Sequence, residues 1–171
     1  ILKLDINKLA PKAKVVANLP YYITTSIITE LIKTNITDIT ILIQKEVAER
    51  ICASPGDKKA GAITYFVNYY ADAEIVANVS KESFIPAPEV ESAIVRIKKL
   101  SEPRVKVKNE ELLFKLIKEN FTKRRKTIMN SISQNIEKNK LSEILAKLGV
   151  SESVRGEELS LEIFAKIADL C

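Results

Sequence analysis

The chain has 171 residues, 46% of them hydrophobic and 29% charged, and its formal net charge of +5 is a modest bias toward polyanionic partners. It contains no histidine, which excludes serine–histidine and cysteine–histidine catalysis and most zinc sites, so we expect no metal. Its four glycines form neither a G-x-G-x-x-G pattern nor a P-loop, which excludes the phosphate-cradling loops of those kinds.

The first part of the chain alternates predicted strands with predicted helices. β-branched apolar runs predict buried strands, and apolar residues at helical spacing predict helices. The predicted strands are 13–20, 36–44, 73–80 and 92–100, and the predicted helices are 24–33, 45–54 and 60–71. This alternation is typical of an α/β fold with a mostly parallel sheet. The last two strands are joined by a proline-containing segment without a helix, which indicates an antiparallel edge.

After "SEPRVKVKNEE" (101–111) the strand pattern stops and helical periodicity takes over. The predicted helices are 109–125, 126–136, 141–150 and 160–171, and Gly149 is expected to end the third of them. We therefore divide the chain into an α/β domain, residues 1–101, and a small all-α domain, residues 102–171.

Other features bear on the protein's location and completeness. No run of 18 apolar residues and no signal peptide is visible, and Cys52 and Cys171 have neither metal spacing nor the pattern of a disulfide framework. We expect a cytoplasmic monomer that does not span a membrane. The chain has no initiator methionine and only four predicted strands, so we infer that it is the later part of a longer protein.

The stretch "NLPYY" (18–22) stands at the predicted end of the first strand, where ligands bind in open α/β sheets. The side-chain oxygen of Asn18 and the carbonyl of Leu19 can accept both N–H groups of a nucleobase amine, which frees the nitrogen lone pair to attack. Pro20 restricts Leu19 to an extended conformation, and Tyr21 offers a face on which a base can stack. The alternative is a strand–helix turn with a buried tyrosine.

Two further stretches are candidate binding elements. Phe84 lies in a loop stiffened by two prolines and could close the other face of a flipped base, although it could equally be a core residue covering the sheet edge. The run "TKRRK" (122–126) places Lys123, Arg124, Arg125 and Lys126 together at a predicted helix end. Phosphate contacts are their natural use, and a solvated helix end is the alternative.

Four blocks in this order resemble a known family: "VVANLPYYITTSIITELI", "LIQKEVAERI", "SFIPAPEVESAIVRI" and "FTKRRKTIMNSI". They are similar to the KsgA family of ribosomal RNA adenine dimethyltransferases, to which the Erm methyltransferases are related. The resemblance runs from Asp5 to the C-terminus. It implies the C-terminal part of a Rossmann-like S-adenosylmethionine-dependent methyltransferase sheet, followed by a helical RNA-binding domain.

The resemblance also implies an activity and a set of roles. The KsgA branch dimethylates N6 of two adjacent adenosines in the 3′-terminal hairpin loop of small-subunit (16S) rRNA and takes part in small-subunit biogenesis. Asn18 would contact the cofactor and the target amine, Tyr21 would stack on the adenine, and Phe84 would line the same pocket. Asp5 would contact the cofactor's adenine; without the resemblance it would be read as an exposed strand-end aspartate.

The chain departs from the family in one respect. The family's glycine-rich cofactor loop and its ribose-binding acidic residue lie upstream of Asp5 and are absent from this sequence. Three alternatives stay open: an Erm-like methyltransferase of 23S rRNA, a non-catalytic rRNA-binding assembly factor, and a DNA amino-methyltransferase, which can carry a similar asparagine–proline–tyrosine motif.

Overall fold

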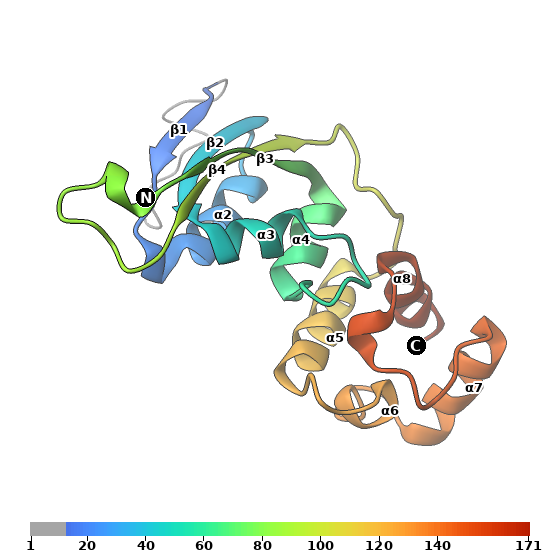
Figure 1. Ribbon diagram of the computed structural model, residues 1–171. Coiled ribbons are helices and arrows are strands. Elements are labelled where there is room, and N and C mark those ends of the chain that lie inside the picture. Colours follow the sequence, from blue (N-terminus) through green and yellow to red (C-terminus); the bar gives the residue numbers. More distant parts are fainter. Residues whose placement is uncertain (1–12) are drawn as a thin grey trace. The chain divides into compact units, whose positions relative to one another are not determined.

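The computed structural model describes residues 13–171 and divides into two compact units (Figure 1). The first unit holds residues 13–53 and 66–104, and the second holds residues 54–65 and 105–171. We predicted a helical domain of residues 102–171. In the structure the segment 54–65 also belongs to the helical unit. Asp5 lies outside the described residues.

The first unit is built on a mixed sheet with the strand order β1-β2-β4-β3. Its strands are β1 (Val15–Asn18), β2 (Asp38–Gln44), β3 (Ala71–Val79) and β4 (Ser92–Lys99). β1 pairs with β2 in parallel, and β4 pairs antiparallel with both β2 and β3. Three strands therefore run in one direction, and the reversed strand, β4, lies between β2 and β3.

One face of the sheet is covered by helices. α2 (Thr24–Lys33) has the predicted bounds and buries Ile27, Ile28, Leu31 and Ile32. β2 alternates between buried and half-buried residues, with Ile39, Ile41 and Ile43 on the buried face. α3 (Lys45–Cys52) packs against β2, β3 and β4, and Figure 1 shows α2 and α3 on the same side of the sheet.

β1 is less buried than the sequence predicts. Val16 is 83% exposed, and β1 is the edge strand of the described sheet. Its residues alternate between half-buried and exposed along the whole strand. The apolar run predicts a strand that is buried on both faces, whereas only one face of β1 is partly buried.

The second unit is helical. Its elements are α5 (Glu110–Thr122), α6 (Ile128–Ser131), α7 (Lys138–Leu148), the 3-10 turn η3 (Gly156–Glu158) and α8 (Leu161–Leu170). The side chain of Asn109 accepts a hydrogen bond from the Leu112 amide (2.9 Å) and so caps α5. Gly149, at φ 67°, ends α7 in the left-handed conformation, which confirms the predicted helix stop.

α6 is much shorter than the predicted helix 126–136. The Ser131 hydroxyl donates to the Ile128 carbonyl (3.2 Å) and to Asn120 (2.8 Å), and Asn135 donates to Glu119. Such side-chain hydrogen bonds compete with helix propagation, and here they hold the chain in turns after one helical turn.

Tyr65 attaches the segment 54–65 to the helical unit. The helix α4 (Ala62–Tyr70) contains it at the division between the two units. Its buried ring packs against Phe121 (centroids 5.3 Å apart) and edge-on against Phe164 (5.5 Å). Its hydroxyl donates to the Leu159 carbonyl (2.5 Å) and accepts from the Gly56 amide (3.1 Å). Burial raises the pKa of Tyr65 to about 12.

Across residues 13–171, no helix combines the length and the apolar character that crossing a membrane requires. Within the same residues, no group of three or more cysteine, aspartate or glutamate side chains is arranged to hold a metal ion.

Candidate active site

The predicted site lies where several strands end at one edge of the sheet. β1 ends at Asn18, which is paired with Leu42 near the end of β2. Ser92, the first residue of β4, is paired with Gln44 of β2 and with Val79 of β3. The stretch after β1 and the loop between β3 and β4 therefore leave the sheet at the same end of its strands. This is the carboxyl end of β1, where ligands bind in open α/β sheets.

The backbone of residues 18–24 is fixed by short-range hydrogen bonds. The Leu19 amide donates to the Leu42 carbonyl of β2 (3.1 Å). The Pro20 carbonyl accepts from the Ile23 amide (3.2 Å) and from the Thr24 hydroxyl (3.0 Å), which closes the 3-10 turn η1 (Tyr21–Ile23) at the start of α2. Pro20 holds φ at −60° with ψ 129°, an extended conformation that turns the chain out of the sheet.

Within the part of the chain that the structure describes, two acceptors of this stretch receive no hydrogen bond. The Leu19 N–H donates to Leu42, but among residues 13–171 no group donates to the Leu19 carbonyl oxygen. The side-chain oxygen of the exposed Asn18 likewise receives no hydrogen bond from these residues. Both groups stand at the carboxyl end of β1. The end of β1 therefore carries two oxygen acceptors, and a primary aromatic amine has two N–H groups to donate.

The β3–β4 loop supplies the other wall of the site. It contains the 3-10 turn η2 (Lys81–Ser83), closed by the Phe84 amide donating to the Lys81 carbonyl (3.3 Å), and Phe84 is half-buried. A pocket of about 340 Å³ lies between this loop and the stretch after β1. Its lining residues are Asn18, Leu19, Pro20, Tyr21, Phe84, Pro86 and Pro88. The structure thus brings together all five predicted catalytic residues, two of which are aromatic.

Sequence reasoning missed Ser92. The Tyr21 hydroxyl lies 2.8 Å from the Ser92 hydroxyl, and Ser92 is completely buried. The two residues are 71 positions apart, and the serine stands in an ordinary strand pattern. Nothing in the local sequence distinguishes it.

An ion pair joins Lys45, the first residue of α3, to Glu91 at the end of the β3–β4 loop. Lys45 Nζ lies 2.6 Å from Glu91 Oε2, and the Lys45 amide donates to the Glu91 carbonyl (3.0 Å). The hydrogen bond lowers the pKa of Glu91 and raises the pKa of Lys45. Both side chains are substantially exposed, so the backbone bond contributes more to the geometry than the ion pair does.

In the second unit, the predicted cationic run stands at the end of a helix, as expected, but the helix ends before it and the run itself forms a turn. α5 ends at Thr122, and the Lys126 amide donates to the Lys123 carbonyl (2.8 Å). A hollow of about 610 Å³ is lined by the four cations together with Thr122 and Asn130.

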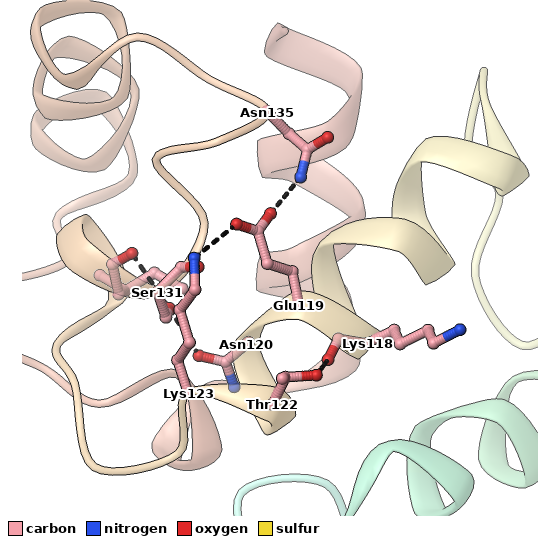
Figure 2. Close-up of polar contacts among 8 residues, drawn as sticks. Lys118, Glu119, Asn120, Thr122, Lys123, Ser131 and Asn135 are labelled. Atoms are coloured by element: carbon pink, nitrogen blue, oxygen red, sulfur yellow. Dashed lines mark hydrogen bonds and ion pairs between the residues drawn. The ribbon is translucent and has the colours of Figure 1, made fainter.

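The four cations fall into two pairs. Lys123 Nζ bonds Glu119 (3.0 Å) and the Ser131 carbonyl (3.2 Å), while Glu119 also accepts from Asn135 (Figure 2). Arg124 contacts Glu157 and the Lys58 carbonyl. Arg125 and Lys126 are exposed, and within the described part of the chain their side chains have no carboxylate partner. The first pair holds the turn in place, and within the described residues no carboxylate engages the second.

Another cation that sequence reasoning missed stands beside this turn. Thr127 pairs with Arg155 in an isolated antiparallel bridge, which sets the exposed Arg155 next to the end of the cationic run. Arg155 is 29 or more positions away in sequence, and a lone arginine after "SESV" carries no motif.

A family model described as "Ribosomal RNA adenine dimethylase" matches residues 2–171. The chain belongs to this family. The membership agrees with the four sequence blocks that indicated it and covers both units of the structure.

Relatives of the dimethylase family are similar to this chain over nearly its whole length. A "Ribosomal RNA small subunit methyltransferase A" of Lachnoclostridium phytofermentans is 48% identical, over 99% of this chain and 63% of its own length. One of Clostridium botulinum is 46% identical, over 98% of this chain and 63% of its own length. The chain therefore spans somewhat less than two thirds of the relatives that it matches.

Solved structures show the same fold. A dimethyladenosine transferase from Plasmodium falciparum superposes with a TM-score of 0.74 at 26% identity, covering 90% of this chain and 64% of that one. The 23S rRNA methyltransferase ErmE superposes with a TM-score of 0.68 at 22% identity, covering 93% and 65%. The described sheet and helices thus have the α/β methyltransferase fold that the resemblance implied.

Proposed function

We propose that the full-length protein containing this chain is an S-adenosylmethionine-dependent rRNA adenine-N6 dimethyltransferase that acts in the cytoplasm. The observation that carries the proposal is the pocket in which Asn18 and the Leu19 carbonyl, two acceptors without partners in the described residues, stand beside the rings of Tyr21 and Phe84. Membership of the dimethylase family supports the same reaction.

The two acceptors act on the target amine. The N6 nitrogen of adenine is a poor nucleophile because its lone pair is delocalised into the ring. When Asn18 Oδ1 and the Leu19 carbonyl each accept one N–H, the nitrogen moves toward tetrahedral geometry and its lone pair becomes available. Because the Leu19 amide is tied to Leu42 (3.1 Å) and Pro20 restricts Leu19 to an extended conformation, this carbonyl is already oriented before the base arrives.

S-adenosylmethionine, when bound, supplies an electrophilic methyl group. We propose that Asn18 and Asp5 help to hold it, with Asp5 outside the described residues. The exposed Asn18 amide at the carboxyl end of β1 fits that task as well as it fits the amine, because its N–H and C=O groups can face two neighbours. After methylation the amine is acidic, so a strong general base is not required, in keeping with a chain that lacks histidine.

The aromatic side chains would hold the base itself. An enzyme that acts on a base must take it out of its stack and cover its faces. Tyr21 would stack on one face, and Phe84, on the opposite loop, would close the other. Stacking of this kind contributes about 1–3 kcal/mol per base.

The helical unit would bind the RNA around the target. Arg125 and Lys126 are exposed cations without carboxylate partners in the described residues, on a turn that Lys123 and Arg124 hold in place. Such groups contact phosphates irrespective of sequence. We therefore assign RNA binding to the helices and chemistry to the sheet edge.

The finer substrate is two adjacent adenosines in the 3′-terminal hairpin loop of 16S rRNA, methylated on the assembling small subunit by a monomeric enzyme. Support comes from relatives that are 48% and 46% identical and are named small-subunit methyltransferases. The likeness to ErmE, at 22% identity, bears on the fold alone.

The experiment that tests this function uses the full-length protein and S-adenosylmethionine. Unmethylated small subunits, large subunits and adenine-containing DNA are incubated separately, and each product is digested and read by mass spectrometry. Two dimethylated adenosines in the 3′-terminal hairpin are expected. Product on 23S rRNA or DNA alone would replace the substrate, and cofactor binding without any product would favour an assembly factor.

A further inference from the structure

Ser92, the first residue of β4, is buried, and its hydroxyl contacts the hydroxyl of Tyr21, which lines the pocket. The serine is 0% exposed, and the distance between the two hydroxyl oxygens is 2.8 Å. A buried hydroxyl needs a hydrogen-bond partner, and Tyr21 provides one from outside the sheet. The contact links the stretch after β1 to the first residue of β4.

The position of Ser92 makes it a rigid point of attachment. β4 lies between β2 and β3, and Ser92 is paired with Gln44 on one side and with Val79 on the other. The preceding residue, Glu91, is bonded to Lys45 through its backbone carbonyl (3.0 Å). The serine hydroxyl is therefore fixed relative to the sheet edge from which Asn18 also projects.

Tyr21, in contrast, is only half-buried and lines the open pocket. A tyrosine ring attached only at its Cβ end can turn about χ1 and χ2, and a base that stacks on it must first select one orientation. A hydrogen bond at the far end of the ring selects that orientation in advance. Pre-organisation of this kind favours a bound geometry without adding a contact to the ligand.

We propose that Ser92 is a positioning residue for the target base, which it controls by setting the orientation of the Tyr21 ring. The inference rests on the proposed function, because it assigns to Tyr21 the stacking face for adenine. It adds a residue that touches neither base nor cofactor. The neighbouring Tyr22 is a natural contrast, since its side chain is 88% exposed and does not line the pocket.

The kinetic test is a double-mutant cycle in the full-length protein. Ser92→Ala, Tyr21→Phe and the double variant are compared for single-turnover methylation of small subunits, with Tyr22→Phe as the matched hydroxyl deletion. Each single variant is expected to lower the methyl-transfer rate roughly three- to tenfold, the worth of one hydrogen bond. The double variant should be no more than about twofold worse than either, and Tyr22→Phe should be unchanged.

A purely structural serine gives a different result. In that case Ser92→Ala lowers the melting temperature but leaves the methyl-transfer rate unchanged. Alternatively, the rate decrease of the double variant equals the product of the decreases caused by Ser92→Ala and Tyr21→Phe. Either result overturns the proposal. If Ser92→Ala does not fold, Tyr21→Phe deletes the same hydrogen bond from its half-buried end and decides the question, since an unchanged rate there also overturns it.

A second readout separates this proposal from the proposed function. Relaxation of the Tyr21 ring carbons, measured by NMR on selectively labelled protein, reports ring order without any turnover. Ser92→Ala should make the ring distinctly more mobile, and unchanged order would overturn the inference even in an active enzyme. A wild-type protein that methylates no adenine would instead contradict the proposed function, whatever the ring does.

Discussion

Gly156 lies so close to Asn120 that only glycine fits. A methyl group on Gly156 would stand 2.0 Å from Asn120 Oδ1 and 2.6 Å from its Nδ2. Asn120 cannot swing away easily, because it is buried and accepts the Ser131 hydroxyl through the same oxygen (2.8 Å; Figure 2). This contact joins the end of α5 to the turn η3.

Gly156→Ala is therefore expected to destabilise the helical unit by about 1–3 kcal/mol through overpacking. Urea unfolding monitored by circular dichroism measures the change. Asn120→Ala removes the obstacle, so the Gly156→Ala substitution should cost clearly less in an Asn120→Ala background. Equal costs in both backgrounds would show that the close approach is not what limits this position.

Tyr65 provides a prediction for pH. Burial favours the neutral phenol and raises its pKa to about 12, above the usual value of 10.0. The stability that this contributes is complete below pH 10 and is lost as the pH rises through about 12. Tyr65→Phe should flatten the decline between these values, as measured by unfolding at stepped pH. A wild-type and a variant curve of the same slope would contradict the assignment.

The same substitution tests how the segment 54–65 is held. Tyr65→Phe leaves the Leu159 carbonyl and the Gly56 amide without their shared partner. A loss of about 1–3 kcal/mol is expected, with faster hydrogen exchange at residues 56–60. Tyr22→Phe, which removes an exposed hydroxyl in the other unit, serves as the control and should change neither quantity.

For the cationic turn, the variant is Arg125→Ala combined with Lys126→Ala. It should weaken binding to small subunits and reduce the magnitude of the salt slope by roughly one to two, because two phosphate contacts are lost. Filter binding at several salt concentrations gives the slope. Lys147→Ala with Lys166→Ala removes two exposed charges elsewhere in the same unit and should leave the slope nearly unchanged. If both double variants changed the salt slope equally, the turn would be an ordinary solvated surface and not a phosphate-binding site.

Phe84 should matter through its ring. Phe84→Ala is expected to lower kcat/KM for methylation by roughly 5- to 100-fold, the worth of one stacking contact, whereas Phe84→Tyr should retain most of the activity. Steady-state methylation of small subunits measures both. Ile85→Ala alters a fully exposed neighbour that does not line the pocket and should have little effect. If Phe84→Ala had a normal kcat/KM, Phe84 would only cover the edge of the sheet and would not stack on the base.

Local patterns predicted the parts of the fold that are determined locally. α2 has the predicted bounds because its apolar residues recur at helical spacing, and Gly149 ends α7 because a left-handed residue was needed there. The candidate site was also predictable in part. A strand end followed by "NLPY" carries its chemistry within four consecutive residues, and the pocket contains all of them.

Long-range contacts could not be predicted in this way. Three features depend on residues that are far apart in the chain. They are the pairing of β4 between β2 and β3, the Tyr21–Ser92 hydrogen bond, and the attachment of the segment 54–65 through Tyr65. The shortening of α6 has a related cause. The helical periodicity of 126–136 was real, but the side chains of Ser131 and Asn135 found partners on α5.

The central claim is that Asn18 polarises the adenine amine, and Asn18→Ala tests it most directly. In the full-length protein, single-turnover methylation of the 3′-terminal hairpin is measured by mass spectrometry alongside the affinity for small subunits. The transfer rate is predicted to fall by at least about a hundredfold, as for the loss of one oriented polar group in an active site, while affinity changes less than threefold. A variant that retains activity within a few-fold would contradict the account.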